Sequence, residues 1–432
     1  MILKLRHGTR DSQGWNLLAY IHPSIFLPYL DLLIDSILLV SSFPSSSHFT
    51  CFYLLLLSIV NLFPLHFTCL NTNQQYESLN NHSHGTLNPH SPSAHAHLSP
   101  AAPPPPPPSS QPNHHLSSPS LPVNILTTFG IPSWAENFAI RSNGQLLVSR
   151  LDTPKSNSSP HQRLPLTITT FNSTTYKGAL GISETLPDIF YVITSAQIDD
   201  NFVKTSGINS IWKINMKTFS QSNGVITSPA TVTKLVDIPG ADFLNGMTTL
   251  NDENILVGDI YNGVVYKICT TNGEYSILLS DPKMKVPADA TTNLGVNGIK
   301  ISNSYLYWTN TAVGSLNRIK IKSDGTPIGT SEVVVNNVPK ADDFIFKSDG
   351  TIWIAQNQAN ELSYVPVGAK QAVLVAGSLI STILAGVTSA HFGRTARDKD
   401  VLYLATSGGL ALPINGTVVV AGSIVTIDTA GF

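Results

Sequence analysis

Four polar residues recur at one position of a repeated segment, where they could bind a cation or polarise a substrate. They are two carboxylates and two amides: Glu136, Asn245, Asn297 and Asp342. A half-buried strand usually carries Val or Ile at such a position, so this set is unusual. Hard divalent cations such as Ca²⁺ and Mg²⁺ take carboxylate, amide and water oxygens as ligands. The set therefore predicts a cation or ligand site, and the alternative is that these groups merely satisfy loop backbone.

Aligning all six copies of the segment turns these residues into two rings. The first, which we call the inner ring, consists of Glu136, Leu180, Asn245, Asn297, Asp342 and Thr388. The second ring consists of Arg150, Thr194, Asp259, Asn310, Gln356 and Thr406. Because the second strand of a hairpin runs antiparallel to the first, both rings should lie at the same face. Arg150, the one cation of the two rings, would either pair with a carboxylate or bind an anion.

The repeated segment that carries the rings is a β-hairpin. AENFAIRSNGQLLVSR at 135–150 and ADDFIFKSDGTIWIAQ at 341–356 both contain two alternating strands joined by Ser-Asn-Gly or Ser-Asp-Gly. The Asn-Gly and Asp-Gly dipeptides within these turns are the strongest short-range hairpin signal. Weaker copies lie at 177–194, 243–259, 295–310 and 386–406.

Further strands follow several hairpins and complete units of four. Third strands are GVVYKICTT, GSLNRIKIKSDG and NELSYVPVG, and fourth strands are YSILLSD, EVVVNN and QAVLVAG. Four short strands at a period of roughly 40 to 65 residues are typical of propeller blades. The sequence thus predicts an all-β fold, a six-bladed β-propeller at residues 122–432, with both rings at one mouth of its channel.

Closure of the propeller requires strands from both chain ends, because an open ring leaves unpaired strand edges. VNILTTF at 123–129 is an alternating strand without a partner in its own repeat. GTVVVAGSIVTIDT at 416–429 is predicted to supply two strands after the sixth hairpin. We expect the first segment to pair beside the second and complete the sixth blade, with nothing before about Pro122 contributing to the fold.

Residues 1–121 are predicted to lie outside the folded domain. Residues 1–70 are strongly apolar, whereas residues 71–121 are rich in Pro, Ser and His and are expected to form a disordered linker. Three interpretations of the apolar segment remain open: a secretory signal, a membrane anchor, or a gene-model artefact translated ahead of the true start. A signal would make the protein secreted, and the sequons at Asn157, Asn172 and Asn415 would fit a glycoprotein.

Composition narrows the choice of partners. The net charge is −2, and charged residues make up only 12% of the chain, with no basic half that would attract nucleic acid. Membrane contact is expected only through residues 1–70, and the domain is expected to be a monomer that binds a small molecule. Three cysteines cannot form a disulfide framework, and Cys269 is expected to be a small buried hydrophobic residue.

The inner ring, with Gly following each Asn, resembles that of the senescence-marker-protein/gluconolactonase/luciferin-regenerating propellers. That resemblance implies a divalent metal held by Glu136, Asn297 and Asp342, with Asn245 contacting the substrate. The Asp segment reads ADDF where that family has P-D-G, and Glu136 lacks the family's E-G-P context. A lactonase or hydrolase dependent on Ca²⁺, Mg²⁺ or Zn²⁺ is therefore the alternative prediction.

WAENFAIRSNGQLLV at 134–148 is more closely similar to a fungal branch of these propellers, whose first blade reads W-x-E-N-x-A-x-R-S-N-G-Q-L-L-V. The resemblance implies secondary-metabolite biosynthesis by a hetero-Diels–Alderase that joins a quinone methide to a terpene alkene. A polyketide or terpenoid intermediate would be the substrate, and no cofactor would be required.

A cycloaddition needs oriented partners and a donor to the carbonyl, and it needs no nucleophile. The chain contains no G-x-S-x-G elbow, P-loop or G-x-G-x-x-G motif. Donor candidates for catalysis are Arg150, Asn245, Asn297, Asn310 and Gln356. A third possibility, a propeller that binds without catalysis, also remains open.

Overall fold

The computed structural model describes residues 120–432 apart from 153–154, 160–165, 172–173, 197–204 and 206. The apolar segment predicted at 1–70 and nearly all of the linker predicted at 71–121 lie outside the described residues. In the described part of the chain the helices are two single 3-10 turns, η2 (Pro282–Met284) and η3 (Asn357–Ala359). None of its helices is long and apolar enough to cross a membrane. The all-β prediction is confirmed.

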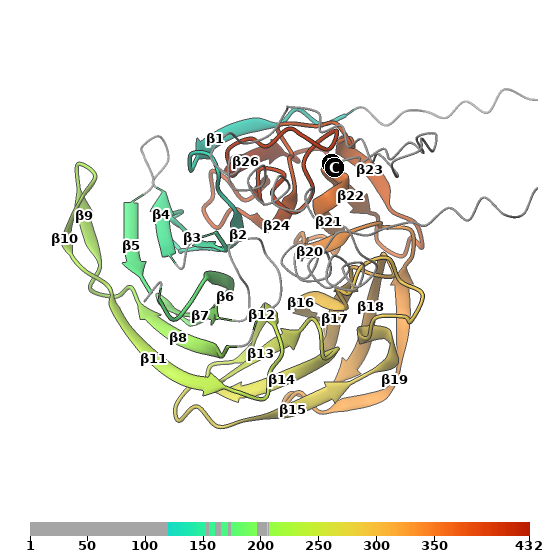
Figure 1. Cartoon of the computed structure of the whole chain (residues 1–432), viewed down its shortest axis with the longest axis horizontal. Helices are drawn as coiled ribbons and strands as arrows, with labels where there is room; N and C mark the ends of the chain where they lie inside the picture. The colour runs from blue at the N-terminus through green and yellow to red at the C-terminus, as the bar shows by residue number, and fades with distance from the viewer. Residues whose placement is uncertain (1–119, 153–154, 160–165, 172–173, 197–204, 206) are drawn as a thin grey trace, which may run out of the picture. The chain divides into compact units, whose positions relative to one another are not determined.

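Six four-stranded antiparallel sheets surround a central channel as the blades of a propeller (Figure 1). Blade 1 consists of β2 (Ala135–Ile140), β3 (Leu146–Arg150), β4 (Lys155–Ser159) and β5 (Leu166–Thr170). Blade 2 consists of β6 (Gly178–Leu186), β7 (Ile189–Ser195), β8 (Asn209–Asn215) and β11 (Thr231–Ile238), with a ribbon of β9 (Ser220–Ser222) and β10 (Val225–Ser228) inserted before its last strand. Blade 3 consists of β12 (Leu244–Asn251), β13 (Asn254–Asp259), β14 (Val264–Cys269) and β15 (Tyr275–Ser280).

The second half of the ring repeats this arrangement. Blade 4 consists of β16 (Val296–Ser302), β17 (Tyr305–Asn310), β18 (Ser315–Ile321) and β19 (Pro327–Val335). Blade 5 consists of β20 (Ala341–Phe346), β21 (Ile352–Gln356), β22 (Glu361–Val365) and β23 (Val373–Gly377). Blade 6 consists of β24 (Val387–Phe392), β25 (Val401–Thr406), β26 (Ser423–Asp428) and β1 (Asn124–Thr128). All six hairpins predicted from the repeats are confirmed.

The hairpin turns adopt the geometry that their sequence dictates. Gly144 and Gly350 lie at φ 86° and 90°, a left-handed conformation that favours glycine. The preceding Asn143 and Asp349 each accept a hydrogen bond on Oδ1 from the backbone N–H two residues later, at 3.0 and 2.9 Å. Such local side-chain bonds are the reason that Asn-Gly and Asp-Gly specify turns.

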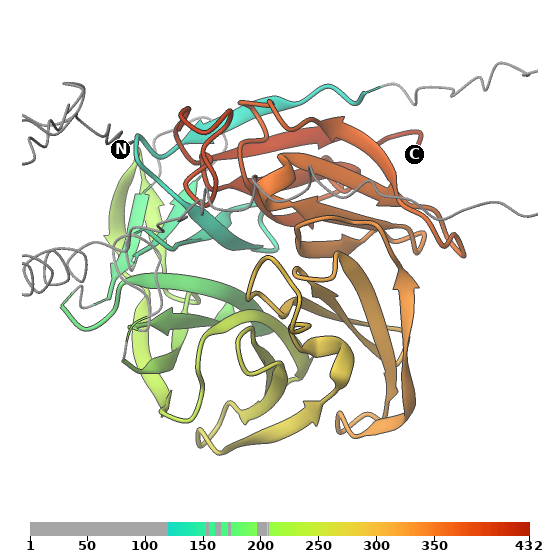
Figure 2. The ribbon, with the colours of Figure 1, turned by 45° about the vertical axis from the view of Figure 1, so that its right-hand side comes forward.

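The ring is closed by both chain ends, as predicted. β1 pairs antiparallel with β26, so that Asn124 lies opposite Thr426, and Figure 2 shows β1 running beside the C-terminal strands. The prediction of two strands within 416–429 is wrong, because β26 already has β25 on one edge and β1 on the other. Leu121 also belongs to the fold, since its N–H donates to Val375 O of blade 5 at 2.7 Å.

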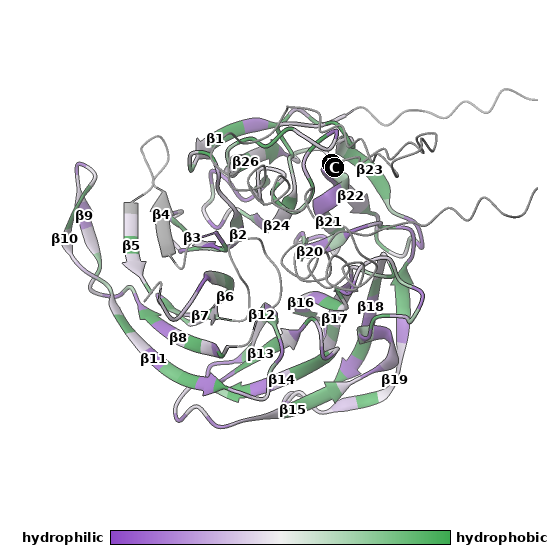
Figure 3. Cartoon of the chain, in the orientation of Figure 1, coloured by the Kyte–Doolittle hydropathy of each residue, from purple (hydrophilic) through white to green (hydrophobic). Residues whose placement is uncertain are grey.

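The hydrophobic core lies between neighbouring blades rather than in the channel. Trp308 of blade 4 packs with Leu256 of blade 3, and Trp353 of blade 5 packs with Leu402 of blade 6; both tryptophans are fully buried. Hydrophobic and hydrophilic residues alternate in bands along outer strands such as β11 and β19 (Figure 3). Each innermost strand contacts the innermost strands of both adjacent blades, so the channel walls are rigidly supported.

Candidate functional site

Every inner-ring residue lies at an irregularity in its innermost strand. The pairing between first and second strands shifts between Ala135 and Asn137 in blade 1 and between Ala341 and Phe344 in blade 5, and equivalent shifts occur in the other four blades. A β-bulge leaves its extra residue out of the ladder and redirects that side chain. The bulges therefore explain how polar side chains on the innermost strands come to face the channel.

Four inner-ring residues line one cavity of about 300 Å³, which we call the ring cavity. They are Glu136, Asn245, Asn297 and Asp342, all of them buried. Close approach of the innermost strands holds this ring together. A Cβ on Gly246 would lie 2.1 Å from Asn297 O, so only glycine fits after Asn245.

Three second-ring residues that were predicted as donors do not line the ring cavity. Arg150 forms an ion pair with Asp152, and its guanidinium lies over the Phe129 ring. Asn310 Nδ2 donates to the backbone oxygens of Lys283 and Lys285, and Gln356 Nε2 donates to Pro339 O. The expectation that these three side chains line the channel mouth is therefore wrong, because they bind neighbouring loops and Asp152 instead. Their predicted catalytic roles remain untested.

The bulge also explains why the sequence alignment placed the second ring one residue away from the residues that line the cavity. Because the inner-ring residue is left out of the ladder, Arg150 pairs with Ala135 and Gln356 pairs with Ala341. Side chains alternate along a strand, so a shift of one position reverses the face. The cavity is lined instead by the residues that follow the second ring in four blades: Leu151, Ile260, Thr311 and Asn357.

A further position, two residues before the inner ring, was missed by the sequence argument. In blades 1, 3 and 5 it holds Trp134, Phe243 and Lys340, all of which line the cavity. In blades 2, 4 and 6 the same position is glycine, at 178, 295 and 386. This alternation is visible in the aligned repeats and could have identified these residues.

The alternation produces three equivalent pairs of side chains around the cavity. Leu151 N–H donates to Trp134 O at 3.1 Å, Ile260 N–H to Phe243 O at 2.9 Å, and Asn357 N–H to Lys340 O at 3.1 Å. We call them the blade-1 pair, the blade-3 pair and the blade-5 pair. The first two are apolar and the third is polar, so the cavity has two hydrophobic walls and one hydrophilic wall.

Both carboxyls of the cavity have pKa values above their ordinary range. Burial raises the pKa of Glu136 to about 7, although hydrogen bonds from Trp134 Nε1 at 2.5 Å and Asn245 Nδ2 at 3.4 Å oppose the rise. Burial and then the charge of Glu136 raise the pKa of Asp342 well above its usual value, against a 2.8 Å hydrogen bond from Asn357 Nδ2. Two buried acids in one site therefore tend to keep protons at neutral pH.

One residue further along the innermost strands, Asn137 and Asp343 form, together with Lys300, a hydrogen-bonded cluster that we call the channel floor. Lys300 Nζ lies 2.6 and 2.7 Å from the two oxygens of Asp343, and Asn137 Nδ2 donates to Asp343 Oδ2 at 3.1 Å. Asn137 and Asp343 directly follow Glu136 and Asp342. The floor thus ties blades 1, 4 and 5 together beneath the ring.

The ring cavity also fits a hard cation. No group of three or more His, Cys, Asp or Glu residues in the described part of the chain could hold a metal ion, so a cation in this cavity would also need neutral oxygen ligands. Asn297 Nδ2 donates to Thr311 at 3.1 Å, and its buried Oδ1 has no hydrogen-bond partner. Glu136, Asn297 and Asp342 could supply only oxygen ligands, which suits Ca²⁺ or Mg²⁺ better than Zn²⁺.

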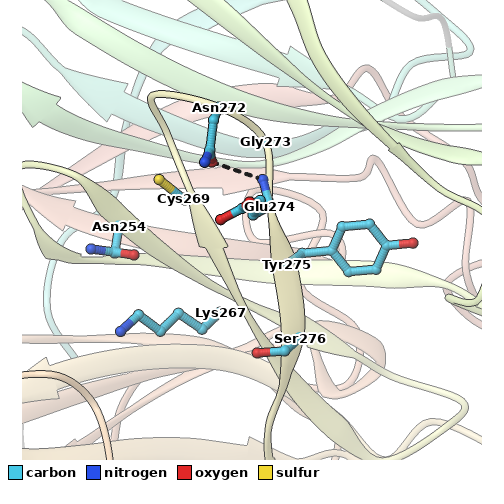
Figure 4. Close-up of a pocket in the computed structure, with 8 residues that line it drawn as sticks. All are labelled: Asn254, Lys267, Cys269, Asn272, Gly273, Glu274, Tyr275 and Ser276. Carbon is cyan, nitrogen blue, oxygen red and sulfur yellow. Dashed lines mark hydrogen bonds between the residues drawn. The ribbon is translucent and has the colours of Figure 1, made fainter.

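A separate hollow lies on the outside of blade 3, at the hairpin between β14 and β15 (Figure 4). Cys269 is half-buried there rather than buried as expected, and its Sγ lies 3.0 Å from Thr271 Oγ1. Glu274 and Tyr275 are exposed on the same hairpin. Because no buried polar group converges on this hollow, the ring cavity is the candidate site.

The chain is similar in sequence to two curated proteins and similar in fold to solved propeller structures. A protein of Sarocladium schorii named as a hetero-Diels-Alderase (asR5) is 25% identical over 380 residues, covering 79% of this chain and 92% of that protein. A protein of a Phoma species, also named as a hetero-Diels-Alderase, is 26% identical over 323 residues, covering 68% and 88%. No family model matches the chain.

Among solved structures, a luciferin-regenerating enzyme superposes with a TM-score of 0.52 at 14% identity, covering 72% of this chain and 96% of that one. The likeness establishes a shared propeller fold and nothing about activity. The sequence-based resemblance to both groups of propellers is confirmed.

Proposed function

We propose that this chain is an enzyme of secondary-metabolite biosynthesis that catalyses a hetero-Diels–Alder-type cyclisation in the ring cavity. The observation that carries the proposal is the similarity, along most of both chains, to two proteins named hetero-Diels-Alderase. The substrate would be a polyketide or terpenoid intermediate, for example a quinone methide that adds to a terpene alkene.

The cavity suits the demands of this reaction. The cycloaddition joins a C=C–C=O unit to a C=C bond; one C–C and one C–O bond form, and no proton or leaving group departs. Catalysis then consists largely of orientation, which can supply ~7–11 kcal/mol of the barrier. The apolar walls made by the blade-1 and blade-3 pairs would hold the two hydrocarbon partners side by side.

The carboxyls would polarise the heterodiene. Negative charge develops on its oxygen as the new bonds form, and a preorganised donor stabilises that charge. Glu136 and Asp342 have raised pKa values, so each can keep a proton near neutral pH and donate it in a hydrogen bond. Asn245 and Asn297 direct their Nδ2 groups to Glu136 and Thr311, so we give them the role of orienting the site.

The experiment is to incubate the purified chain with a generated ortho-quinone methide and an alkene and to resolve the products by chiral chromatography. We expect an enriched stereoisomer that disappears in the Glu136→Leu/Asp342→Ala double variant, which has no donor at either position. Glu332→Leu, on the exposed outer strand β19, is the matched control and should retain the enrichment. Product ratios identical to the uncatalysed reaction would contradict the proposal.

A divalent-metal-dependent lactonase or hydrolase is the second candidate, favoured by the unsatisfied Asn297 Oδ1 in an oxygen-only set. A bound divalent cation would polarise a lactone carbonyl and acidify water. Glu136, Asn297 and Asp342 would hold it, and Asn245 would contact the substrate. Stoichiometric Ca²⁺ or Mg²⁺ in the purified protein, with lactonase activity lost on chelation, would support this candidate. Ligand binding without either activity would instead identify a binding propeller.

A further inference from the structure

The cation of the blade-5 pair differs from every other residue that lines the ring cavity. Lys340 is the one Lys or Arg among the lining residues described, which otherwise comprise apolar, amide, hydroxyl and carboxyl side chains. No hydrogen bond or ion pair within the described part of the chain involves its ammonium group. By contrast, Lys300 and Arg150 both have carboxylate partners. A lysine left unpaired beside a buried site is available to a ligand.

The backbone holds Lys340 in an unusual conformation at this place. Its φ is 59°, in the left-handed region that long side chains rarely adopt. Its carbonyl accepts from Asn357 N–H, while Ala341 N–H donates to Val338 O at 3.1 Å, so the loop is fixed on both sides of it. Non-glycine residues in this region cluster at ligand sites, where the surrounding structure maintains them.

The position itself argues against a purely structural role. The equivalent residues Trp134 and Phe243 have aromatic rings, and the other three blades have glycine. A lysine at this position offers less apolar area than an aromatic ring, and it brings a positive charge to the cavity on a flexible stem. The blade-5 wall therefore offers a charge that the two apolar walls lack.

We propose that Lys340 is a specificity-determining residue that binds an ionised oxygen, a carboxylate or an enolate, on a substrate whose remaining parts are apolar. The inference rests on the proposed function only in taking the ring cavity as the ligand site. It deepens that function by naming the substrate class: an amphiphilic acid whose hydrocarbon part contacts the blade-1 and blade-3 pairs.

The test is a binding measurement that needs no turnover. Calorimetry would compare naphthalene-1-acetate with naphthalene-1-acetamide, which have nearly the same shape and differ in charge. A charge-assisted hydrogen bond contributes about 1.5–3 kcal/mol, so the full chain should bind the acetate about tenfold to a hundredfold more tightly. Lys340→Met should remove the preference and Lys340→Arg should keep it, whereas Lys320→Met on exposed β18 should change nothing.

Equal binding of acid and amide, no binding of either, or a preference that survives in Lys340→Met would overturn the inference. The outcome is independent of catalysis. A clear preference for the acid in a protein without cyclase activity would support the role of Lys340 and contradict the proposed function alone.

Discussion

Polar groups at the channel floor and in the ring cavity lie one residue apart in sequence, but they differ in whether the chain itself supplies their hydrogen-bond partners. On the floor, Asp343 receives hydrogen bonds from Lys300 and Asn137, so its charge is fully compensated. In the cavity, Asp342 lies near a second acid, and two buried amide oxygens, Asn297 Oδ1 and Asn357 Oδ1, have no hydrogen-bond partner among the described residues. The comparison shows that the charge on the floor is compensated within the chain, whereas the cavity keeps two acids close together and leaves buried amide oxygens without a partner among the described residues.

The closure of the ring, in which β1 pairs with β26, resembles the floor because its polar groups are paired within the chain. Removing this closure should lower stability more than any other change. Deleting residues 1–129 removes β1 and leaves the edge of β26 exposed together with the core beneath it. We expect loss of soluble expression, measured against a chain that lacks only residues 1–120, which should unfold at the same temperature as the full chain. Equal stability of both truncations would contradict the prediction that the fold depends on closure of the ring by β1.

Lys300→Met should break the floor next. The change leaves Asp343, whose side chain is 3% exposed, as an uncompensated buried charge. Removing one partner of such a pair typically destabilises a protein by about 3–5 kcal/mol. Denaturant unfolding should register this loss, and the Lys300→Met/Asp343→Asn double variant should recover much of it. If the double variant were no better, packing rather than charge would explain the effect.

Asp342→Ala should sharpen the comparison, because removing the carboxyl of Asp342 from the cavity should lower activity while sparing stability. Loss of one donor to a developing oxyanion typically lowers kcat about 10²–10³-fold. The unfolding free energy should stay the same or rise, since a buried acid beside Glu136 is removed. Steady-state kinetics and denaturant unfolding of the same sample test both halves. Reduced stability with full activity would mean that Asp342 belongs with the floor.

The pH dependence of stability should show the smallest effect. Folding raises the pKa of Glu136 from 4.5 to about 7, so between these values the folded state binds more protons than the unfolded state. Stability from this group is then present below pH 4.5 and falls as the pH rises towards 7, by about 3 kcal/mol in total. Glu136→Gln should flatten this slope in unfolding experiments across pH 4–8, and an unchanged slope would contradict the raised pKa.

Local signals in the sequence were sufficient to determine the hairpins, the blades and the inner ring. The turns around Gly144 and Gly350 depend on residues that are adjacent in the chain, so pattern alone identifies them. The pairing of β1 with the C-terminal strand β26 was predictable because the lone strand before the first hairpin had no partner in its own repeat. The likeness to the hetero-Diels-Alderases followed from the same first-blade hairpin.

Only the tertiary structure decided which side chains reach the cavity. The bulges at the inner ring shift the register by one residue, which turns Arg150 and Gln356 onto loops and brings Leu151 and Asn357 to the site. A bulge depends on the close approach of neighbouring blades, as at Gly246 against Asn297 O, and that contact joins residues far apart in sequence. The chain thus specified its strands locally, and the packing of six blades against one another selected the residues that line the ring cavity.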